Sequence, residues 1–253
     1  MILASFSLKG KTALVTGSSR GLGAGIALAL AEAGANVALH GSRSVPESTR
    51  KTIAAAGTRT VALAADVSVE SACVQLMDEV LQAFGGIDIL VNNAGTIRRA
   101  PAAEHSMEDW NAVLATNLTS VFRLTQLAGK HMLEQRSGKV INIASMLTFQ
   151  GGVFVPSYAA AKGGVGQLTK AFANEWAAKG VNVNAIAPGY MATDNTAVLQ
   201  KDPERSRQIL ERIPAGRWGV PADLAGAAVF LASHASDYVH GQILAVDGGW
   251  LAR

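Results

Sequence analysis

Three polar residues in the second half of the chain have types and spacing suited to proton transfer. Tyr158 and Lys162 lie four residues apart in a stretch with a helical pattern, so one helix face would carry both the phenol and the ammonium. Ser145 ends an apolar run thirteen residues before Tyr158, and the intervening loop can bring its hydroxyl back toward the phenol. A free phenol has a pKa near ~10, so it needs a neighbouring positive charge to act as a base at neutral pH. We therefore expect Tyr158 to exchange a proton with a substrate oxygen, Ser145 to hold that oxygen, and Lys162 to tune the phenol.

Asn117, within ATNLTS, is the fourth candidate of this group. We expect it to cap or bend its helix and to hold a water that links Lys162 to solvent. A tyrosine and a lysine four residues apart are common in helices, where the tyrosine packs on a sheet and the lysine is solvated. The additional serine, asparagine and glycine turn favour catalysis over that alternative.

The glycine turn follows the first apolar run, residues 12–16, and leads directly into a helical pattern. Its spacing is G-x-x-x-G-x-G, with glycines at Gly17, Gly21 and Gly23. Glycines let a backbone approach a pyrophosphate closely, and the free amides and dipole at a helix start favour its negative charge. The turn predicts a dinucleotide site, although the turn by itself is also compatible with a plain loop.

The end of the second apolar run bears on which nicotinamide cofactor would bind. A carboxylate there usually accepts hydrogen bonds from the adenosine ribose of NAD. Here the sequence reads His40-Gly41-Ser42-Arg43, without a carboxylate, and Arg20 lies in the glycine turn. Two guanidinium groups could face a 2′-phosphate, which favours NADP(H); two solvated surface arginines are the alternative.

Further cofactor candidates follow the third and fourth apolar runs. Asp66 could bind the adenine amino group, and an Asx turn is a competing explanation for it. The small residues of Asn93-Ala94-Gly95 would let a ribose lie against the backbone at the carboxyl edge of a sheet, where ligands of open α/β sheets bind.

Apolar runs and helical patterns alternate along the whole chain, which predicts parallel strands with helices on both faces. We expect an α/β fold with a single Rossmann-type, doubly wound domain over residues 1–253, because no linker interrupts the pattern. A polar, helix-prone segment at about 193–217 breaks the rhythm and is a candidate substrate lid. The seven expected strands are 12–16, 36–40, 60–65, 87–93, 139–145, 181–189 and 242–249.

Composition and charge narrow the possible partners. A net charge of +3 with scattered arginines argues against nucleic acid as a partner. No window approaches the ~18 apolar residues of a membrane span, so we expect no membrane partner and a cytoplasmic location. Cys73 fits a small buried hydrophobe, and the five histidines show no ligand spacing, so no metal site is expected.

The motifs TGSSRGLG, NNAG and APGYMAT, together with Asn117, Ser145, Tyr158 and Lys162, resemble the short-chain dehydrogenase/reductase family over the whole chain. Leu22 replaces the isoleucine usual in that family. The resemblance implies a strand order of 3-2-1-4-5-6-7, those four catalytic residues, and an NAD(P)(H) cofactor. The expected cofactor-binding residues are Gly17, Ser19, Arg20, Gly21, Leu22, Gly23, Ser42, Arg43, Asp66, Val67, Asn93, Ala94, Gly95, Tyr158, Lys162, Pro188, Gly189, Met191 and Thr193.

Longer stretches, among them IASMLTFQGGVFVPSY, IPAGRWG and VDGGWLAR, are similar to a narrower family. This is the 2-dehydro-3-deoxy-D-gluconate 5-dehydrogenase family, also labelled 2-deoxy-D-gluconate 3-dehydrogenase. The resemblance implies interconversion of the ketone and alcohol of a sugar acid in uronate breakdown, and a homotetramer. Members are mostly described with NAD(H), which opposes the arginine argument for NADP(H).

A sugar acid needs a cation for its carboxylate, and Arg98 or Arg99, just beyond Gly95, could supply a bidentate fork. Gln150 is a weaker candidate for substrate hydroxyls, and Asn195 adds a further polar group to the expected substrate loops. One alternative is a β-ketoacyl thioester or broad carbonyl reductase of the same fold, and another is a non-catalytic dinucleotide sensor.

Overall fold

Seven apolar runs of the sequence form a parallel β-sheet in the computed structural model, which describes residues 1–253 except for the Asn195 side chain. The sheet order is β3-β2-β1-β4-β5-β6-β7, which confirms the predicted topology. The observed strands are mostly shorter than the apolar runs that predicted them. They are β1 Thr12–Val15, β2 Asn36–Gly41, β3 Thr60–Ala64, β4 Ile89–Asn92, β5 Gly138–Ile143, β6 Val181–Pro188 and β7 Ile243–Val246.

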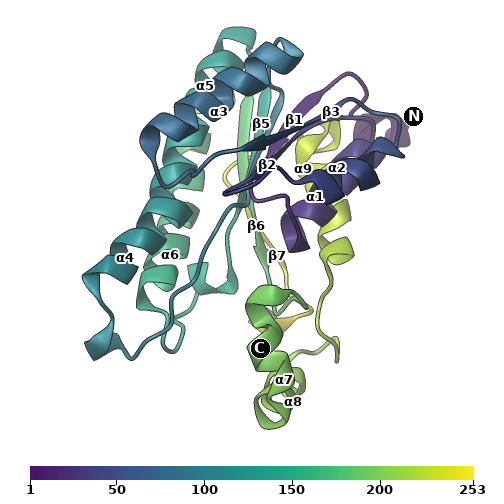
Figure 1. Cartoon of the computed structure of the whole chain (residues 1–253). Coiled ribbons are helices and arrows are strands. Elements are labelled where there is room, and N and C mark those ends of the chain that lie inside the picture. Colours follow the sequence, from purple (N-terminus) through teal and green to yellow (C-terminus); the bar gives the residue numbers. More distant parts are fainter.

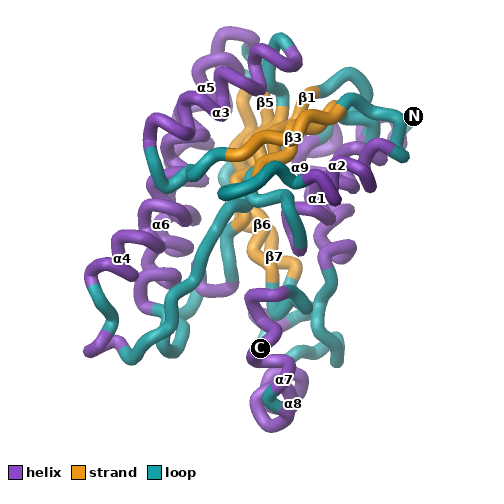
Figure 2. Tube along the Cα trace, viewed as in Figure 1, coloured by secondary structure: helices purple, strands orange, loops and turns teal.

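Helices cover both faces of this sheet (Figures 1 and 2). Helices α1, α2 and α9 lie on one side, and α3 to α6 lie on the other. The helices are α1 Gly21–Glu32, α2 Glu47–Ala54, α3 Glu70–Phe84, α4 Met107–Leu114, α5 Ser120–Gln135, α6 Pro156–Trp176, α7 Ala197–Lys201, α8 Pro203–Arg212 and α9 Ala225–Ala232.

Strand β1 shows why the strands are apolar at nearly every position. Successive side chains of a strand point to opposite faces of the sheet. Ala13 and Val15 pack into the apolar cluster that contains Ile26 of α1, whereas Leu14 packs into the cluster that contains Leu76 of α3 and Leu124 of α5. All four residues of β1 are buried. Since each face of the strand is covered by a helical layer, a polar side chain on either face would lose its hydration.

Residues 107–135 form two α-helices, α4 and α5, separated by a π-helical turn at Ala115–Thr119. Helix α4 begins at Met107, where the Ser106 side chain accepts a hydrogen bond from the backbone of Asp109. The π turn carries Asn117, whose side chain is fully buried. Such turns inside helices are frequent at functional sites.

The segment expected as a lid projects beyond the sheet as α7 and α8, after the short helical turn Asp194–Thr196 (Figure 1). Its base is apolar: Ile209 and Ile213 pack with Trp250 at the end of the chain. The Arg212 guanidinium lies 4.0 Å from the centroid of the Trp250 ring. The segment is therefore anchored to the C-terminal residues, and its movement as a lid stays a prediction.

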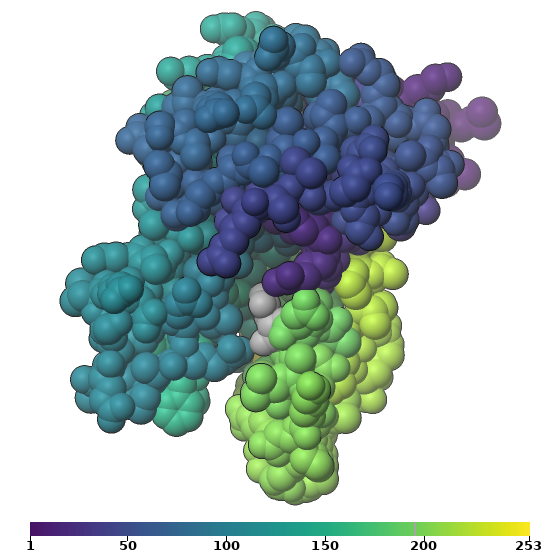
Figure 3. Space-filling view, in the orientation of Figure 1, coloured from purple at the N-terminus to yellow at the C-terminus, as the bar shows by residue number. Residues whose placement is uncertain are grey.

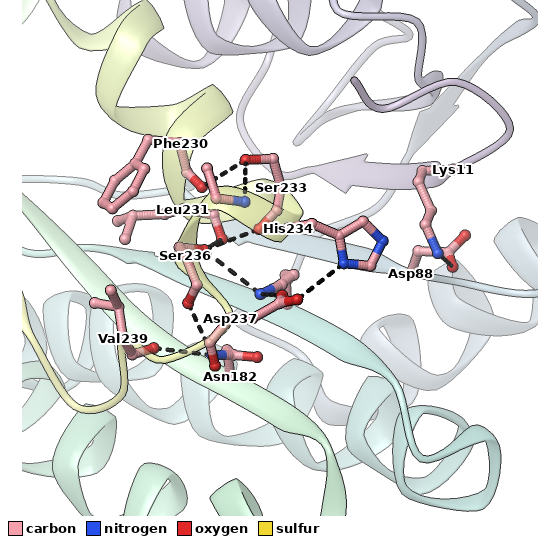
Figure 4. A network of polar contacts seen from close by, with 12 residues as sticks. Lys11, Asp88, Asn182, Phe230, Leu231, Ser233, His234, Ser236, Asp237 and Val239 are labelled. Atoms are coloured by element: carbon pink, nitrogen blue, oxygen red, sulfur yellow. Dashed lines mark hydrogen bonds and ion pairs between the residues drawn. The ribbon is translucent and has the colours of Figure 1, made fainter. Parts of the chain in front are cut away.

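The amino ends of the strands carry a polar network that ties distant segments together (Figure 4). Lys139 Nζ donates to Asp237 Oδ1 at 2.7 Å, and Lys11 Nζ pairs with Asp88 Oδ1 at 3.1 Å. The Asn182 amide donates to the carbonyls of Ser236, Asp237 and Val239. This network lies at the edge of the sheet opposite the expected site, so its role is to hold the ends of β1, β5 and β6 in place.

None of the helices in the described part of the chain combines the length and the apolar character that a membrane crossing requires.

Candidate functional site

The residues expected to act together gather beyond the carboxyl ends of the strands. The glycine turn follows β1, residues 42–43 follow β2, residues 93–95 follow β4, Ser145 follows β5, and residues 189–193 follow β6. Parallel strands bring all of these ends to one edge of the sheet, where open α/β folds bind ligands. In Figure 3 the surface is hollowed between the teal block of α4 and α6 and the green segment of α7 and α8.

The glycine turn has a backbone that other residues would strain. Gly17 and Gly21 have positive φ angles of 63° and 57°. A Cβ added to Gly23 would lie 2.3 Å from the Gly17 carbonyl oxygen and 2.4 Å from Asn93 Nδ2. The three glycines predicted from the spacing are thus each required by the backbone or its neighbours.

Asn93 holds this turn closed from the neighbouring strand. Its side-chain amide donates to the carbonyl oxygens of Thr16 at 2.9 Å and Gly17 at 3.0 Å. The Thr16 hydroxyl in turn accepts from the backbone amides of Asn93 and Ala94, both at 2.9 Å. Asn93 was expected as a direct cofactor contact, and the structure gives its side-chain amide a positioning role at the turn. Thr16 was not identified from the sequence, although a hydroxyl at the end of β1 was a signal.

His40 fastens the same turn to the end of β2 and was missed as a functional residue. Its buried ring accepts from Gly17 N–H through Nδ1 at 3.0 Å, and Nε2 lies 2.8 Å from the Ala65 carbonyl oxygen. The pair of bonds requires the neutral ring with its proton on Nε2. Burial lowers the pKa of His40 below its usual 6.5, in keeping with a neutral ring.

The turn and the start of α1 fit the pyrophosphate of a dinucleotide. The first helical hydrogen bond runs from Ala24 N–H to the Arg20 carbonyl, so the amides before Ala24 have no partner within the helix. Such amides, with the positive end of the helix dipole, bind anions. Ser42 and Arg43, directly after β2, are exposed, and their expected contact with the adenosine ribose and its substituents stays a prediction.

For Asp66 we considered two roles, binding of the adenine amino group and an Asx turn. The structure shows the Asx turn. Its Oδ1 accepts from the Ser68 backbone amide at 3.1 Å and from the Ser68 hydroxyl at 2.7 Å. The adjacent Val67 is buried, and its carbonyl accepts from the Cys73 thiol. Burial raises the pKa of Cys73 to about 11, which agrees with an unreactive buried thiol.

Ser145, Tyr158 and Lys162 are brought together at the carboxyl end of β5. The Ser145 side chain hydrogen-bonds the Tyr158 phenol, and Lys162 Nζ lies 5.6 Å from the centroid of the Tyr158 ring. Lys162 is buried, and its ammonium donates to the Ile143 carbonyl at 2.6 Å. The helical spacing of four residues therefore places the phenol and the ammonium on one face, as predicted.

The loop that carries Ser145 is fixed to α6. Ser145 begins the helical turn Met146–Thr148, where its Oγ accepts from the Leu147 amide at 3.2 Å. The Thr148 hydroxyl donates to the Lys162 carbonyl at 2.9 Å. These bonds fix the position of the Ser145 hydroxyl relative to the side chains of α6.

Burial dominates the electrostatics of this group. It raises the pKa of Tyr158 above 10, while the Ser145 hydrogen bond and the charge of Arg99 act in the opposite direction. Burial also lowers the pKa of Lys162 to about 8. Among the protein's own groups, burial outweighs those that lower the pKa of the phenol, so the phenol is protonated at neutral pH. The expected effect of Lys162 on the phenol stays a prediction. A protonated phenol is the form that donates a proton in a reduction.

Asn117 reaches back to the segment after β4 from the π turn. Its Oδ1 accepts from the Thr96 amide at 2.8 Å, and its Nδ2 donates to the Thr96 carbonyl at 2.9 Å. The helix is interrupted by a π-helical turn at this residue, and the side chain fixes the segment that leads to Arg98 and Arg99. Its expected role in holding a water stays a prediction.

The structure distinguishes the three candidates for binding substrate. Arg98 pairs through Nε with Asp109 Oδ1 at 3.1 Å, whereas Arg99 is close enough to the Tyr158 phenol for its charge to lower the pKa of that group. Gln150 accepts from Trp250 Nε1 at 3.4 Å and so braces the end of the chain. Asn195, the fourth polar residue considered, has its side chain outside the described part.

The segment after β6 was expected to contact the nicotinamide. A Cβ added to Gly189 would lie 2.5 Å from Asp247 Cα, so this glycine allows β6 and the segment after β7 to approach closely. Met191 is buried and Thr193 lies next to the glycine turn, with its methyl 3.7 Å from the position of a Gly21 Cβ. Within the described residues, no group of three His, Cys, Asp or Glu side chains is placed to hold a metal ion.

The two hydrogen bonds of the His40 ring, here called the His40 clasp, lead to a prediction on the stability of the fold. His40→Ala removes two buried hydrogen bonds and leaves a cavity, and we expect it to lower the free energy of unfolding by about 2–3 kcal/mol. His40→Gln can offer an acceptor and a donor in the same place, so it should recover part of that loss. Urea denaturation at pH 7.5 measures both.

The same clasp has a pH dependence with a definite sign. Because the folded pKa of His40 lies below 6.5, the unfolded chain binds the proton more readily, and stability falls as the pH falls below about 6.5. His40→Gln should lose this part of the slope between pH 7.5 and pH 5.5. Equal slopes in wild type and His40→Gln, or a glutamine variant no more stable than the alanine variant, would contradict the clasp.

Comparison with known proteins gives relatives over the whole chain. The model of the family described as Enoyl-(Acyl carrier protein) reductase matches residues 17–251. A 2-dehydro-3-deoxy-D-gluconate 5-dehydrogenase from Escherichia coli (strain K12) is 56% identical over 255 residues, with 100% of both chains covered. The alignment thus spans both chains in full.

Solved structures share both the fold and much of the sequence. One, assigned to a 2-deoxy-D-gluconate 3-dehydrogenase from Agrobacterium tumefaciens with bound NADP, is 56% identical, has a TM-score of 0.93, and covers 98% of this chain and 99% of its own. Another, a gluconate 5-dehydrogenase from Burkholderia cenocepacia in complex with NADP and tartrate, is 40% identical with a TM-score of 0.95 and covers 100% of both chains. Fold, sequence and family match agree that this chain belongs to the short-chain dehydrogenase/reductase family of NAD(P)-dependent oxidoreductases.

Proposed function

We propose that the protein interconverts the ketone and alcohol of a keto-deoxy sugar acid, of the 2-dehydro-3-deoxy-D-gluconate type, with NADP(H) as the preferred cofactor. The observation that carries the proposal is the position of Arg99, whose positive charge acts on the same phenol that Ser145 hydrogen-bonds. A cation beside the proton-transfer group suits a substrate that carries a carboxylate a few atoms from its carbonyl. The names of the relatives, several of which are sugar-acid dehydrogenases, support the same substrate class.

In the proposed mechanism Tyr158 is the general acid and base. A bound nicotinamide supplies or accepts the hydride. Ser145 holds the reacting oxygen by a hydrogen bond, and in the reductive direction Tyr158 donates its proton to that oxygen. In the oxidative direction Tyr158 takes the proton from the alcohol, which requires phenolate. Lys162, buried beside the ring, favours that phenolate by its charge, and Asn117 holds the water through which Lys162 exchanges protons with solvent.

The cofactor preference rests on the end of β2. Ser42 and Arg43 are exposed there in place of a carboxylate, and Arg20 lies in the glycine turn. A guanidinium offers donors in a fork that matches a phosphate. Two solved relatives have NADP bound, which supports the same choice for this chain.

Initial rates test the substrate and the cofactor together. The purified chain should turn over 2-dehydro-3-deoxy-D-gluconate, or reduce its 2,5-diketo counterpart, more efficiently than a β-ketoacyl thioester, with kcat/KM higher for NADP(H) than for NAD(H). Arg99→Ala should raise the KM for the sugar acid by about tenfold or more while leaving the KM for cofactor unchanged. Arg98→Ala, which removes an arginine already paired with Asp109, is the matched control and should have a smaller effect.

The outcomes of these rates separate the alternatives. A higher kcat/KM for the acyl ketone would replace the sugar acid with an acyl substrate. Unchanged KM values in both arginine variants would show that neither residue anchors a carboxylate.

Tyr158→Phe tests the mechanism without changing the shape of the site. We expect turnover to fall by about 10²- to 10⁴-fold, because the proton donor is lost, while binding of the cofactor persists. Tyr238→Phe makes the same chemical change on a fully exposed tyrosine and should leave turnover unaffected. Full activity of Tyr158→Phe would refute the mechanism.

We also propose that the chain assembles as a homotetramer. Edge strand β7 leaves Leu244 exposed, and on α5 the exposed Phe122 stacks on Phe172 of α6 with 5.9 Å between ring centroids. Exposed apolar side chains on a strand edge and on a helix pair are surfaces that a second copy can cover. Sedimentation velocity at micromolar concentration should give a single species of about four chains, and a monomer would exclude the assembly.

A further inference from the structure

An ion pair joins the glycine turn to the start of the lid segment. Arg20, the residue before α1, places Nε 2.9 Å from Asp194 Oδ2. Asp194 begins the helical turn that precedes α7, and the neighbouring Thr193 methyl lies against Gly21. In Figure 3 the green lid segment meets the purple amino-terminal segment. Two segments far apart in the sequence are thus in contact at the edge of the candidate cofactor site.

Arg20 is also one of the two guanidinium groups proposed to receive a 2′-phosphate. Its Nε already forms an ion pair with a carboxylate in the structure, so a phosphate would have to share or displace that partner. Both side chains are largely exposed, at 78% for Arg20 and 73% for Asp194. Because an exposed ion pair is weak, a doubly charged phosphate can displace it, but at a loss of affinity.

Arg43 provides the contrast within the same site. It is exposed, and among the described residues it makes no ion pair, so its charge is available without competition. The two arginines therefore differ in what a phosphate must overcome to bind them. NAD(H), which lacks the 2′-phosphate, would bind without disturbing the Arg20 pair.

We propose that Asp194 is a specificity-determining residue that weakens the preference for NADP(H) by competing with the 2′-phosphate for Arg20. The inference rests on the proposed nicotinamide site. It predicts that the two cofactors respond differently to the loss of this one carboxylate. Asp194→Asn frees Arg20 and removes a negative charge beside the phosphate, while the side chain keeps its size.

Direct binding tests the inference without turnover. Isothermal titration calorimetry with NADP⁺, NAD⁺ and adenosine 2′,5′-bisphosphate compares wild type, Asp194→Asn, Arg20→Ala and the double variant. We expect Asp194→Asn to tighten NADP⁺ and the bisphosphate about three- to tenfold and to leave NAD⁺ unchanged. In the Arg20→Ala background the same change should have no effect, because the group under competition is gone.

A matched control removes a carboxylate elsewhere on the lid. Glu204→Gln acts on α8, where Glu204 pairs with Arg207, and should leave all three affinities unchanged. Equal tightening of NAD⁺ and NADP⁺ by Asp194→Asn, no change in either, or a gain that persists without Arg20 would each overturn the inference. Failure of wild type to bind any of the three ligands would overturn the proposed cofactor site itself, and the inference with it.

Discussion

The glycine turn after β1 can exist only because neighbouring strands satisfy its backbone. A turn that leaves the end of a buried strand exposes amides and carbonyls at a place where water has little access, and each needs a partner. The Asn93 side chain donates to two carbonyls of the turn, and the His40 ring accepts from the Gly17 amide. Residues at the ends of β4 and β2 thus hold the turn from both sides. These bonds fix the start of α1, whose first amides have no partner within the helix. The shape of this candidate cofactor site therefore depends on the Asn93 and His40 side chains, which bind the backbone of the turn.

The group of Ser145, Tyr158 and Lys162 likewise consists of polar side chains that are buried and hydrogen-bonded. Lys162 is deep enough for burial to lower its pKa to about 8, yet its ammonium has a carbonyl partner in Ile143. The Tyr158 phenol is raised in pKa by burial and held by Ser145. A site arranged in this way keeps its proton until a change of charge nearby favours the phenolate, which suits an enzyme that works in either direction.

The segment between β6 and α8 connects these two parts of the site. Its base is held by the aromatic residues Tyr190, Trp218 and Trp250, and its beginning meets the glycine turn through Arg20 and Asp194. The aromatic contacts hold one end of the segment firmly, whereas the exposed Arg20–Asp194 ion pair at the other end is weak. A ligand can therefore change the contact at that second end. Under the proposal made above, the identity of the cofactor would act on this segment through that contact.

The sequence alone determined the fold class, because seven apolar runs that alternate with helical patterns indicate parallel strands covered on both faces, as β1 illustrates with Leu14 opposite Ala13 and Val15. It also determined which residues could do chemistry, since glycine spacing and the i, i+4 relation of Tyr158 and Lys162 act through local geometry. Only the tertiary structure decided which residues far apart in the sequence contact each other, because the spacing of residues along the chain carries no information about such contacts. His40 and Thr16 became parts of the glycine turn because strands 20 or more residues apart bring their atoms within hydrogen-bond distance. Arg98 and Arg99 are adjacent in sequence, but Arg98 pairs with Asp109 and the charge of Arg99 acts on the Tyr158 phenol. The pKa of Tyr158 was likewise decided by burial, which depends on every element packed around the phenol and on no single neighbour in the chain.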